Sequence, residues 1–293
     1  MSVNPNVLVF RYSRENKINV SDSYLRYLSQ KIWERLSLVF GDQLIAKGGL
    51  IISEYLDQPS RVTKDMDATL LAEKYDENQL FTSWREALEL NRDDGIVLTD
   101  ISFVKERVTI SKPIPGYLVK MKVELPSIDP QRPKKRVRLQ ISADVTIENN
   151  VVPKPQKLNF RAFAENETAV NVYPIEQIVA EKMQAILNHG ERTTRMRDFA
   201  DLSSLYDLYR NNISLRDLAA SVWHQQLSRL IIFDYGMLTR IYDLLRENKN
   251  SQRLWDEYAE RNGITTSFDQ ILDQSWQWFN DYFAYEEENL ITS

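Results

Sequence analysis

Residues 44–50 are Leu44-Ile45-Ala46-Lys47-Gly48-Gly49-Leu50, a short apolar run that ends in two adjacent glycines. A stretch long enough for one helix follows, and a second short run, residues 62–70, then contains Asp65 and Asp67. This order predicts a strand over 44–46, a short helix over 50–56 and a second strand over 62–70. The glycine pair is thus expected at a strand-to-helix turn, where free N–H groups bind anions well.

The two aspartates point to a metal and a phosphate. If residues 62–70 form a strand, Asp65 and Asp67 share one face with Arg61, Thr63 and Thr69. Two carboxylates this close repel each other, and a divalent cation removes the conflict, because Mg²⁺ is typically held by one or two carboxylates together with substrate phosphates. The glycines let backbone approach a phosphate without a Cβ in the way. The pattern predicts phosphoryl or nucleotidyl transfer, and the alternative is a surface strand with two solvated aspartates.

Composition excludes several other kinds of site. The 293-residue chain has no cysteine, which excludes disulfides and thiolate metal sites, and only two histidines, which argues against a zinc site. No apolar stretch approaches the roughly 20 residues of a membrane span, and the first residues lack the features of a signal peptide, so we expect a cytoplasmic protein. The net charge of −5 argues against general nucleic-acid coating but allows a local basic patch.

The pattern predicts an α/β (α+β) domain over residues 1–170, with a mixed sheet and flanking helices, and an all-helical domain over residues 171–293. Residues 1–20 are expected to be irregular, with a small strand or an arm at 7–10. Residues 150–171 are expected to form a loop. The aromatic residues of the last helices are expected in the core. The helices and strands predicted between residues 21 and 147 are, in order, 21–40, 44–46, 50–56, 62–70, 72–90, 101–107, 108–111, 117–125 and 137–147.

The strand over 137–147 alternates strictly, with apolar residues at odd positions and polar residues at even positions. Asp144 therefore points to the polar face, together with Gln140, Ser142 and Thr146. On this pattern alone Asp144 is an exposed strand residue. The preceding segment, 126–136, is expected to be an exposed hairpin loop that carries a basic run.

Two charges lie on apolar helix faces in the C-terminal half. Lys182 is four residues from both Ile178 and Ile186, and Asp198 is four residues before Leu202. Inward-facing charges on consecutive helices are expensive unless they meet a partner. Three interpretations are open for Lys182: it extends its charge to the edge of the apolar face, it is aimed at a phosphate, for which lysine is a suitable point charge, or it pairs with Asp198 in a structural salt bridge.

These motifs together resemble a known family. Lys47-Gly48-Gly49 with Arg61-Val62-Thr63-Lys64-Asp65-Met66-Asp67 resembles the first motif of the nucleotidyltransferase superfamily, and more narrowly that of the AbiEii/AbiGii toxins of type IV toxin–antitoxin systems. The segment from Tyr173 to Leu202, with Glu181-Lys182 and Arg197-Asp198-Phe199, resembles the second signature of that family. The gap from Gly49 to Asp65 is longer than in the minimal superfamily pattern but typical of this family.

The resemblance implies a nucleotidyltransferase-like sheet and a site in a cleft to which the helical domain contributes. Asp65, Asp67 and Asp144 are then the implied ligands of Mg²⁺, and Asp144 lies where family members have an aspartate. Lys182 and Asp198 are implied active-site residues. Gly48 and Gly49 are expected to bind nucleotide phosphates, with Arg61 and Arg197 as further candidates that are equally compatible with surface ion pairs.

The resemblance also implies a toxin that transfers a nucleotide from an NTP to RNA, with the tRNA 3′ end as a candidate acceptor, and a cognate antitoxin. The alternatives are an enzyme that modifies a protein side chain or a small molecule, and a nucleotide-binding module without catalysis. No membrane partner is expected. The basic residues that could guide RNA are Lys134, Lys135, Arg136, Arg138, Arg192 and Arg195.

Overall fold

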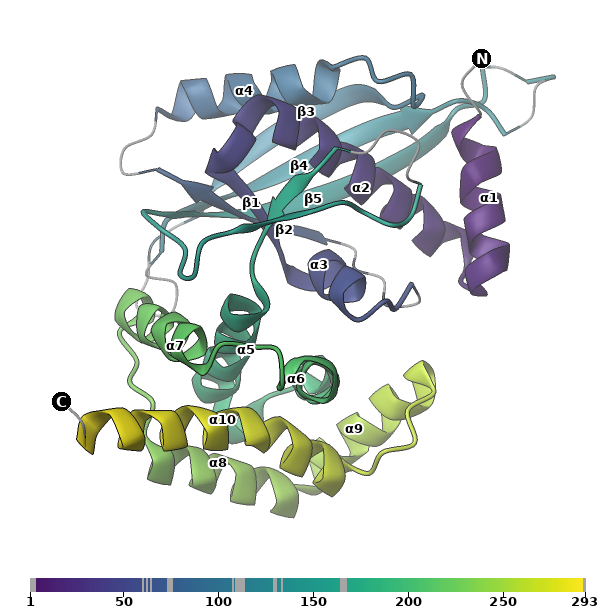
Figure 1. The fold of residues 1–293 in the computed structure, drawn as a ribbon. Helices are drawn as coiled ribbons and strands as arrows, with labels where there is room; N and C mark the ends of the chain where they lie inside the picture. The colour runs from purple at the N-terminus through teal and green to yellow at the C-terminus, as the bar shows by residue number, and fades with distance from the viewer. Residues whose placement is uncertain are drawn as a thin grey trace. The chain divides into compact units, whose positions relative to one another are not determined.

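The chain folds into two compact units, Met1–Tyr173 and Pro174–Ser293 (Figure 1). The structure is a computed structural model that describes residues 4–59, 61, 63, 65–72, 76–106, 108, 114–128, 131–132, 134–163 and 168–291. Val62, Lys64 and most of the strand predicted over 108–111 lie outside these residues. The first unit is an α/β unit and the second is helical, so the predicted fold class is confirmed.

One mixed sheet forms the centre of the α/β unit. Its strand order within the described residues is β3-β4-β5-β2-β1-β7-β6. Strand β2 pairs in parallel with β5, and β1 in parallel with β7, while the other pairs are antiparallel. The strands are β1 (Leu44–Lys47), β2 (Asp65–Leu71), β3 (Val97–Lys105), β4 (Gly116–Leu125), β5 (Val137–Glu148), β6 (Gln156–Leu158) and β7 (Val170–Val172).

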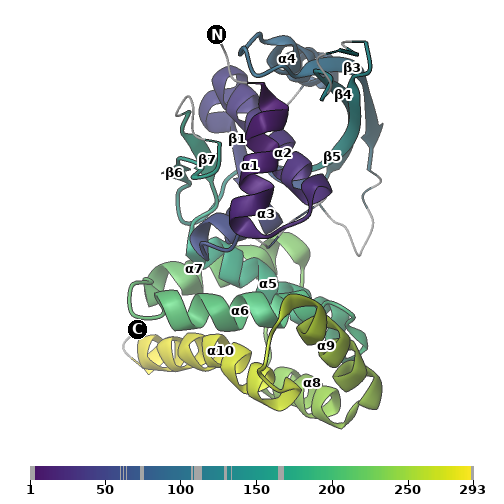
Figure 2. The ribbon, with the colours of Figure 1, turned by 90° about the vertical axis from the view of Figure 1, so that its right-hand side faces the viewer.

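Helices cover one face of this sheet, as Figure 2 shows for α2 beside β5. The odd-numbered side chains of β4 and β5, such as Val119, Met121 and Val145, are fully buried on that face. Phe81 of α4 stacks on Phe103 of β3 with ring centroids 4.0 Å apart. The helices of the unit are α1 (Pro5–Asn16), α2 (Val20–Phe40), α3 (Gly48–Tyr55) and α4 (Glu77–Glu89). The even-numbered residues of β4 and β5 therefore face the opposite side.

Two parts of the α/β unit differ from the sequence prediction. Residues 5–16 form helix α1 rather than an arm, because Asn4 caps it, Pro5 occupies its first turn and Val9 is buried in a cluster with Tyr27. The predicted loop over 150–171 contains β6 and β7. These strands have three residues each, too few for a visible alternation; β7 takes its position from pairing with β1, and β6 from pairing with β7.

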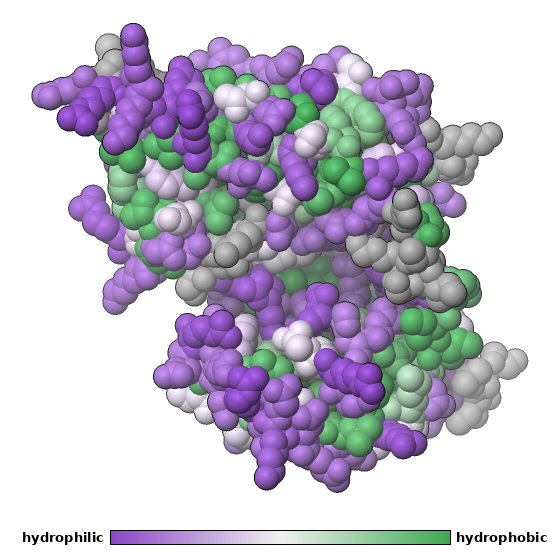
Figure 3. Space-filling model, turned by 180° about the vertical axis from the view of Figure 1, so that it is seen from behind, coloured by the Kyte–Doolittle hydropathy of each residue, from purple (hydrophilic) through white to green (hydrophobic). Residues whose placement is uncertain are grey.

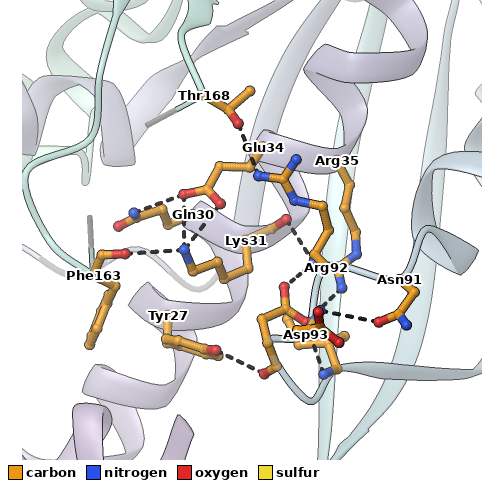
Figure 4. Close-up of polar contacts among 12 residues, drawn as sticks. Tyr27, Gln30, Lys31, Glu34, Arg35, Asn91, Arg92, Asp93, Phe163 and Thr168 are labelled. Atoms are coloured by element: carbon orange, nitrogen blue, oxygen red, sulfur yellow. Dashed lines mark hydrogen bonds and ion pairs between the residues drawn. The ribbon is translucent and has the colours of Figure 1, made fainter. Parts of the chain in front are cut away.

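Helix α2 carries buried charges that fix the connecting segments around it (Figure 4). Lys31 Nζ lies 3.1 Å from Glu34 Oε2 and donates to the carbonyl oxygen of Phe163 at 3.1 Å. Arg35 forms a two-pronged ion pair with Asp94, in the turn before β3. Each charge is compensated, so the cluster has a structural explanation.

The helical unit follows Pro174, which precedes its first helix. Trp255, Trp278 and Phe279 are fully buried, as expected of core aromatics, whereas Trp223 and Tyr235 are about half exposed. Its helices are α5 (Ile175–His189), α6 (Met196–Tyr209), α7 (Leu215–Arg229), α8 (Tyr235–Glu247), α9 (Lys249–Asn262) and α10 (Phe268–Ile291). Among the described residues, none of the helices combines the length and the apolar character that crossing a bilayer requires.

Candidate active site

The acidic residues of β2 and β5 are neighbours on one face of the sheet. In the parallel register, Asp67 pairs with Asp144 and Asp65 pairs with Ser142. Paired residues on adjacent strands point to the same face, and their strands lie about 4.8 Å apart. Ser142 Oγ donates a hydrogen bond of 2.6 Å to Asp65 Oδ1. The sheet thus places Asp144 directly beside Asp67, although the two residues are far apart in the sequence.

The glycine pair packs directly against these residues. Gly48 has φ +73°, and a Cβ added there would lie 1.9 Å from Asp67 Oδ2. A Cβ at Gly49 would lie 2.9 Å from the Cβ of Thr63, and the Arg61 guanidinium donates to the carbonyl oxygen of Gly49. Both glycines open helix α3, which has no hydrogen-bonded side-chain cap within the described residues. Its first N–H groups therefore meet the requirement for an anion site beside Asp67.

Lys47 lies next to Asp67, although it was not among the site residues predicted from the sequence. It pairs in register with Asp67 on the antiparallel neighbour β1, and its Nζ lies 5.2 Å from the ring centroid of Tyr173. The Tyr173 hydroxyl is 2.6 Å from Thr69 Oγ1. Thr69 is the next residue after Asp67 on the same face of β2. Apart from its place in the Lys47-Gly48-Gly49 motif, the sequence showed only a lysine at the end of an apolar run, because a four-residue strand shows no periodicity.

A second cluster of charges forms within the helical unit. Lys182 Nζ of α5 lies 2.7 Å from Asp198 Oδ1 and 2.7 Å from Asp201 Oδ2, both on α6. Arg195 Nε lies 2.6 Å from the second oxygen of Asp198. Burial raises the pKa of Asp198, but the charges and hydrogen bonds of Lys182 and Arg195 outweigh it and hold the pKa below its ordinary value. The ion pair that the sequence allowed is present, and Asp201 is an additional partner.

The remaining predicted cations are spread over both units. Arg61 is half-buried against Gly49, and Arg197 is exposed on α6. Lys134, Lys135 and Arg136 are exposed in the connection between β4 and β5, as the loop prediction expected. Arg138 follows on β5 and pairs with Glu124 at 2.9 Å. In the helical unit, Arg192 and Arg195 are exposed, and Arg195 is engaged with Asp198 as described above.

Comparison with known proteins identifies the family. A family model described as nucleotidyl transferase AbiEii toxin of type IV toxin–antitoxin systems matches residues 31–274. The chain belongs to this family. The match includes both motif regions, from the glycine turn to Asp198, so the resemblance inferred from the sequence is confirmed. An AbiEii chain is a nucleotidyltransferase toxin by family.

Solved structures and curated proteins give more distant results. MenT4, a nucleotidyltransferase toxin from Mycobacterium tuberculosis, is 13% identical, with 93% of this chain and 98% of that chain covered and a TM-score of 0.49. A nucleotidyltransferase-like antigenic protein from Paracoccidioides brasiliensis is 15% identical, with 77% and 91% covered and a TM-score of 0.37. No curated protein sequence matches the chain.

The carboxylates of this AbiEii chain suit magnesium in their chemistry. Among the described residues, no three Asp, Glu or His side chains converge closely enough to hold a metal ion without other ligands. Magnesium does not require such a cage, because it usually takes one or two carboxylates and completes its shell with water and phosphate oxygens. Asp67 and Asp144, side by side and next to the Gly48 turn, fit an ion of this kind.

Proposed function

We propose that this chain transfers a nucleoside monophosphate from an NTP to an RNA acceptor, with the 3′ end of tRNA as the first acceptor to test. One observation supports the proposal above the others: Asp67 is paired with Asp144 and is in contact with the Gly48 turn. A metal-binding pair and a phosphate-binding turn at one point of a sheet are the parts that phosphoryl transfer needs.

In the proposed reaction the acceptor hydroxyl oxygen forms a bond to the α-phosphorus of the NTP. The bond from that phosphorus to the bridging oxygen breaks, and pyrophosphate leaves. Asp144 accepts the hydroxyl proton, and the N–H groups at Gly48 and Gly49 hold the phosphates. Asp65, Asp67 and Asp144 would hold Mg²⁺, which when bound stabilises charge on the attacking and leaving oxygens.

Lys182 and Asp198 of the helical unit stay proposed active-site residues. Within that unit, Asp198 orients the Lys182 ammonium through the 2.7 Å contact. The double ion pair with Asp198 and Asp201 also supports a second role for Lys182, which is to hold α5 and α6 together. Arg61 and Arg197 are proposed as secondary phosphate contacts.

The test uses the full-length chain, NTPs labelled at the α-phosphate, and either total tRNA or total protein. We expect label on RNA and release of pyrophosphate, both lost in Asp67→Asn. Asp256→Asn, which removes an exposed carboxylate on α9, is the matched control and should keep the activity. Label on protein only, or NTP binding without transfer to any acceptor, would overturn the RNA proposal in favour of the two alternatives stated above.

Toxicity provides a second readout, and it also tests the proposed antitoxin. Expression of the wild-type chain is expected to arrest growth, while Asp65→Ala and Lys182→Ala should not, provided that both variants accumulate to the wild-type level. Co-expression of the proposed cognate antitoxin should restore growth. Arrest that persists in both variants would separate toxicity from the proposed chemistry.

A further inference from the structure

The polar face that carries the acids continues across β5 onto β4. In register, Asp65 of β2 pairs with Ser142 of β5, and Ser142 pairs with Lys120 of β4. Because paired residues share a face, Lys120 lies on the same side of the sheet as the carboxylates, two strands away from Asp65. The Lys120 side chain is exposed, and within the described part of the chain it makes no hydrogen bond or ion pair.

Further exposed polar side chains extend this face along the β4–β5 hairpin. Lys122 follows Lys120 on β4, and Gln140 and Arg138 follow Ser142 on β5, while the alternate residues are buried or partly buried on the opposite face. The distance from Asp144 to Arg138 along β5 is about 20 Å at roughly 3.3 Å per residue. The strip ends at the basic connection of residues 134–136, and Figure 3 shows hydrophilic side chains gathered at that end, at its upper left.

The cations of this strip are available to an anionic chain. Lys122 pairs with Asp100 at 2.9 Å and Arg138 with Glu124 at 2.9 Å, but the cationic side chains are 60% and 85% exposed. Exposed pairs of this kind are worth only about 0–1 kcal/mol, so a phosphate can replace the carboxylate. No aromatic side chain belongs to this face among the described residues of β4 and β5, so base stacking has no platform there.

We propose that the strip formed by Lys120, Lys122, Arg138, Gln140 and Ser142 binds the single-stranded 3′ end of the RNA acceptor through its backbone. Lys120 contacts the phosphate nearest the reacting hydroxyl, because it is the cation of the strip closest in register to the acids. This inference rests on the proposed function and adds the path of the acceptor. It predicts recognition with little base preference, since phosphate contacts position a strand and carry no sequence information.

The test measures transfer of labelled nucleotide to a single-stranded RNA oligonucleotide as a function of RNA concentration. Lys120→Gln is expected to raise KM for RNA about tenfold, the size expected for one charge-assisted contact. Adding Lys122→Gln and Arg138→Gln should raise KM further and flatten its dependence on salt. The dissociation constant for the NTP should not change in either variant.

The matched control removes three exposed cations from α1 and its C-terminal cap, on the helix-covered side: Arg11→Gln, Arg14→Gln and Lys17→Gln. It changes net charge by the same amount as the triple strip variant and should leave KM for RNA at the wild-type value. An unchanged KM in the strip variants, or an equal rise in the α1 control, would overturn the acceptor path while leaving the proposed function intact. If the wild-type chain labels protein instead of RNA, the proposed function itself fails.

Discussion

The two units place their charged groups in opposite arrangements. In the helical unit, Lys182 lies between Asp198 and Asp201, so each buried charge has a neighbour of opposite sign. In the α/β unit, Asp67 and Asp144 are register partners, so two like charges are neighbours on adjacent strands. The first arrangement groups both carboxylates around one lysine, whereas in the second Asp67 lies between the like charge of Asp144 on β5 and Lys47 on β1.

This difference separates residues that stabilise from residues that bind. A buried ion pair lowers the energy of the folded chain relative to the state with one partner removed, so its loss should appear mainly in stability. Neighbouring carboxylates contribute little to stability, and their loss should appear mainly in binding and turnover. The variants below test that separation, beginning with the largest expected effect.

Lys182→Met should lower the free energy of unfolding by about 3–5 kcal/mol, because it leaves Asp201 and part of Asp198 without the buried cation. Chemical denaturation measures this directly. The matched control is Lys122→Met, which removes a lysine from the exposed pair with Asp100 and should cost less than about 1 kcal/mol. Equal losses of unfolding free energy in the two variants would show that burial does not make the Lys182 ion pairs more stabilising than an exposed pair.

Asp67→Asn should reduce nucleotide transfer about a thousandfold, since a metal that neutralises transition-state charge is worth several kcal/mol. Its stability should change by less than about 1 kcal/mol, because relief of the repulsion from Asp144 offsets the contacts that are lost. Transfer rates and denaturation midpoints of the same preparations check both parts. If Asp67→Asn lost several kcal/mol of stability but kept full activity, Asp67 would be a stabilising residue and not a binding one.

Gly48→Ala should lower both the stability of the fold and the rate of nucleotide transfer, each to an intermediate degree. The positive φ costs about 1–2 kcal/mol for a residue with a Cβ, and the new methyl would displace the Asp67 carboxylate, so transfer should fall as well. Gly190→Ala is the matched control, because Gly190 also has a positive φ, +55°, but a Cβ added there would meet no atom within 4 Å. The control should lose stability and keep activity.

The sequence predicted those parts of the site that follow from strand alternation. Asp65 and Asp67 were placed on one face of β2, and Asp144 was placed on the polar face of β5, because each strand is long enough for a period of two to be visible. Their side-by-side register could not be predicted, since parallel pairing of β2 with β5 depends on the whole sheet. Their roles as metal ligands stay predictions.

The features that the sequence missed share a physical cause, which is tertiary contact without a local pattern. Lys47 and strand β7 belong to segments of four and three residues, too short for periodicity. Asp201 lies three residues after Asp198 and looked like an ordinary polar position of α6, until the fold placed Lys182 between the two carboxylates. Helix α1 depends on the Asn4 cap and on the burial of Val9. These two features were too weak in the sequence to predict a helix within a mostly polar segment.

The smallest expected effect is the pH dependence of stability that Asp198 gives to the helical unit. Since the folded-state pKa of Asp198 lies below its ordinary value of 3.8, the unfolded chain binds this proton more readily. The stabilisation from Asp198 is therefore fully present above about pH 5 and is lost as pH falls below 3.8 towards the folded-state pKa.

Asp198→Asn should be less stable than the wild type at neutral pH, and this difference in stability should narrow as the solution is acidified. Urea midpoints measured from about pH 7 down to about pH 3 test this, with Asp256→Asn as the control for net charge. A gap of constant size over that range would mean that Lys182 and Arg195 do not depress the pKa of Asp198, and the contrast between the two units would then rest on geometry alone.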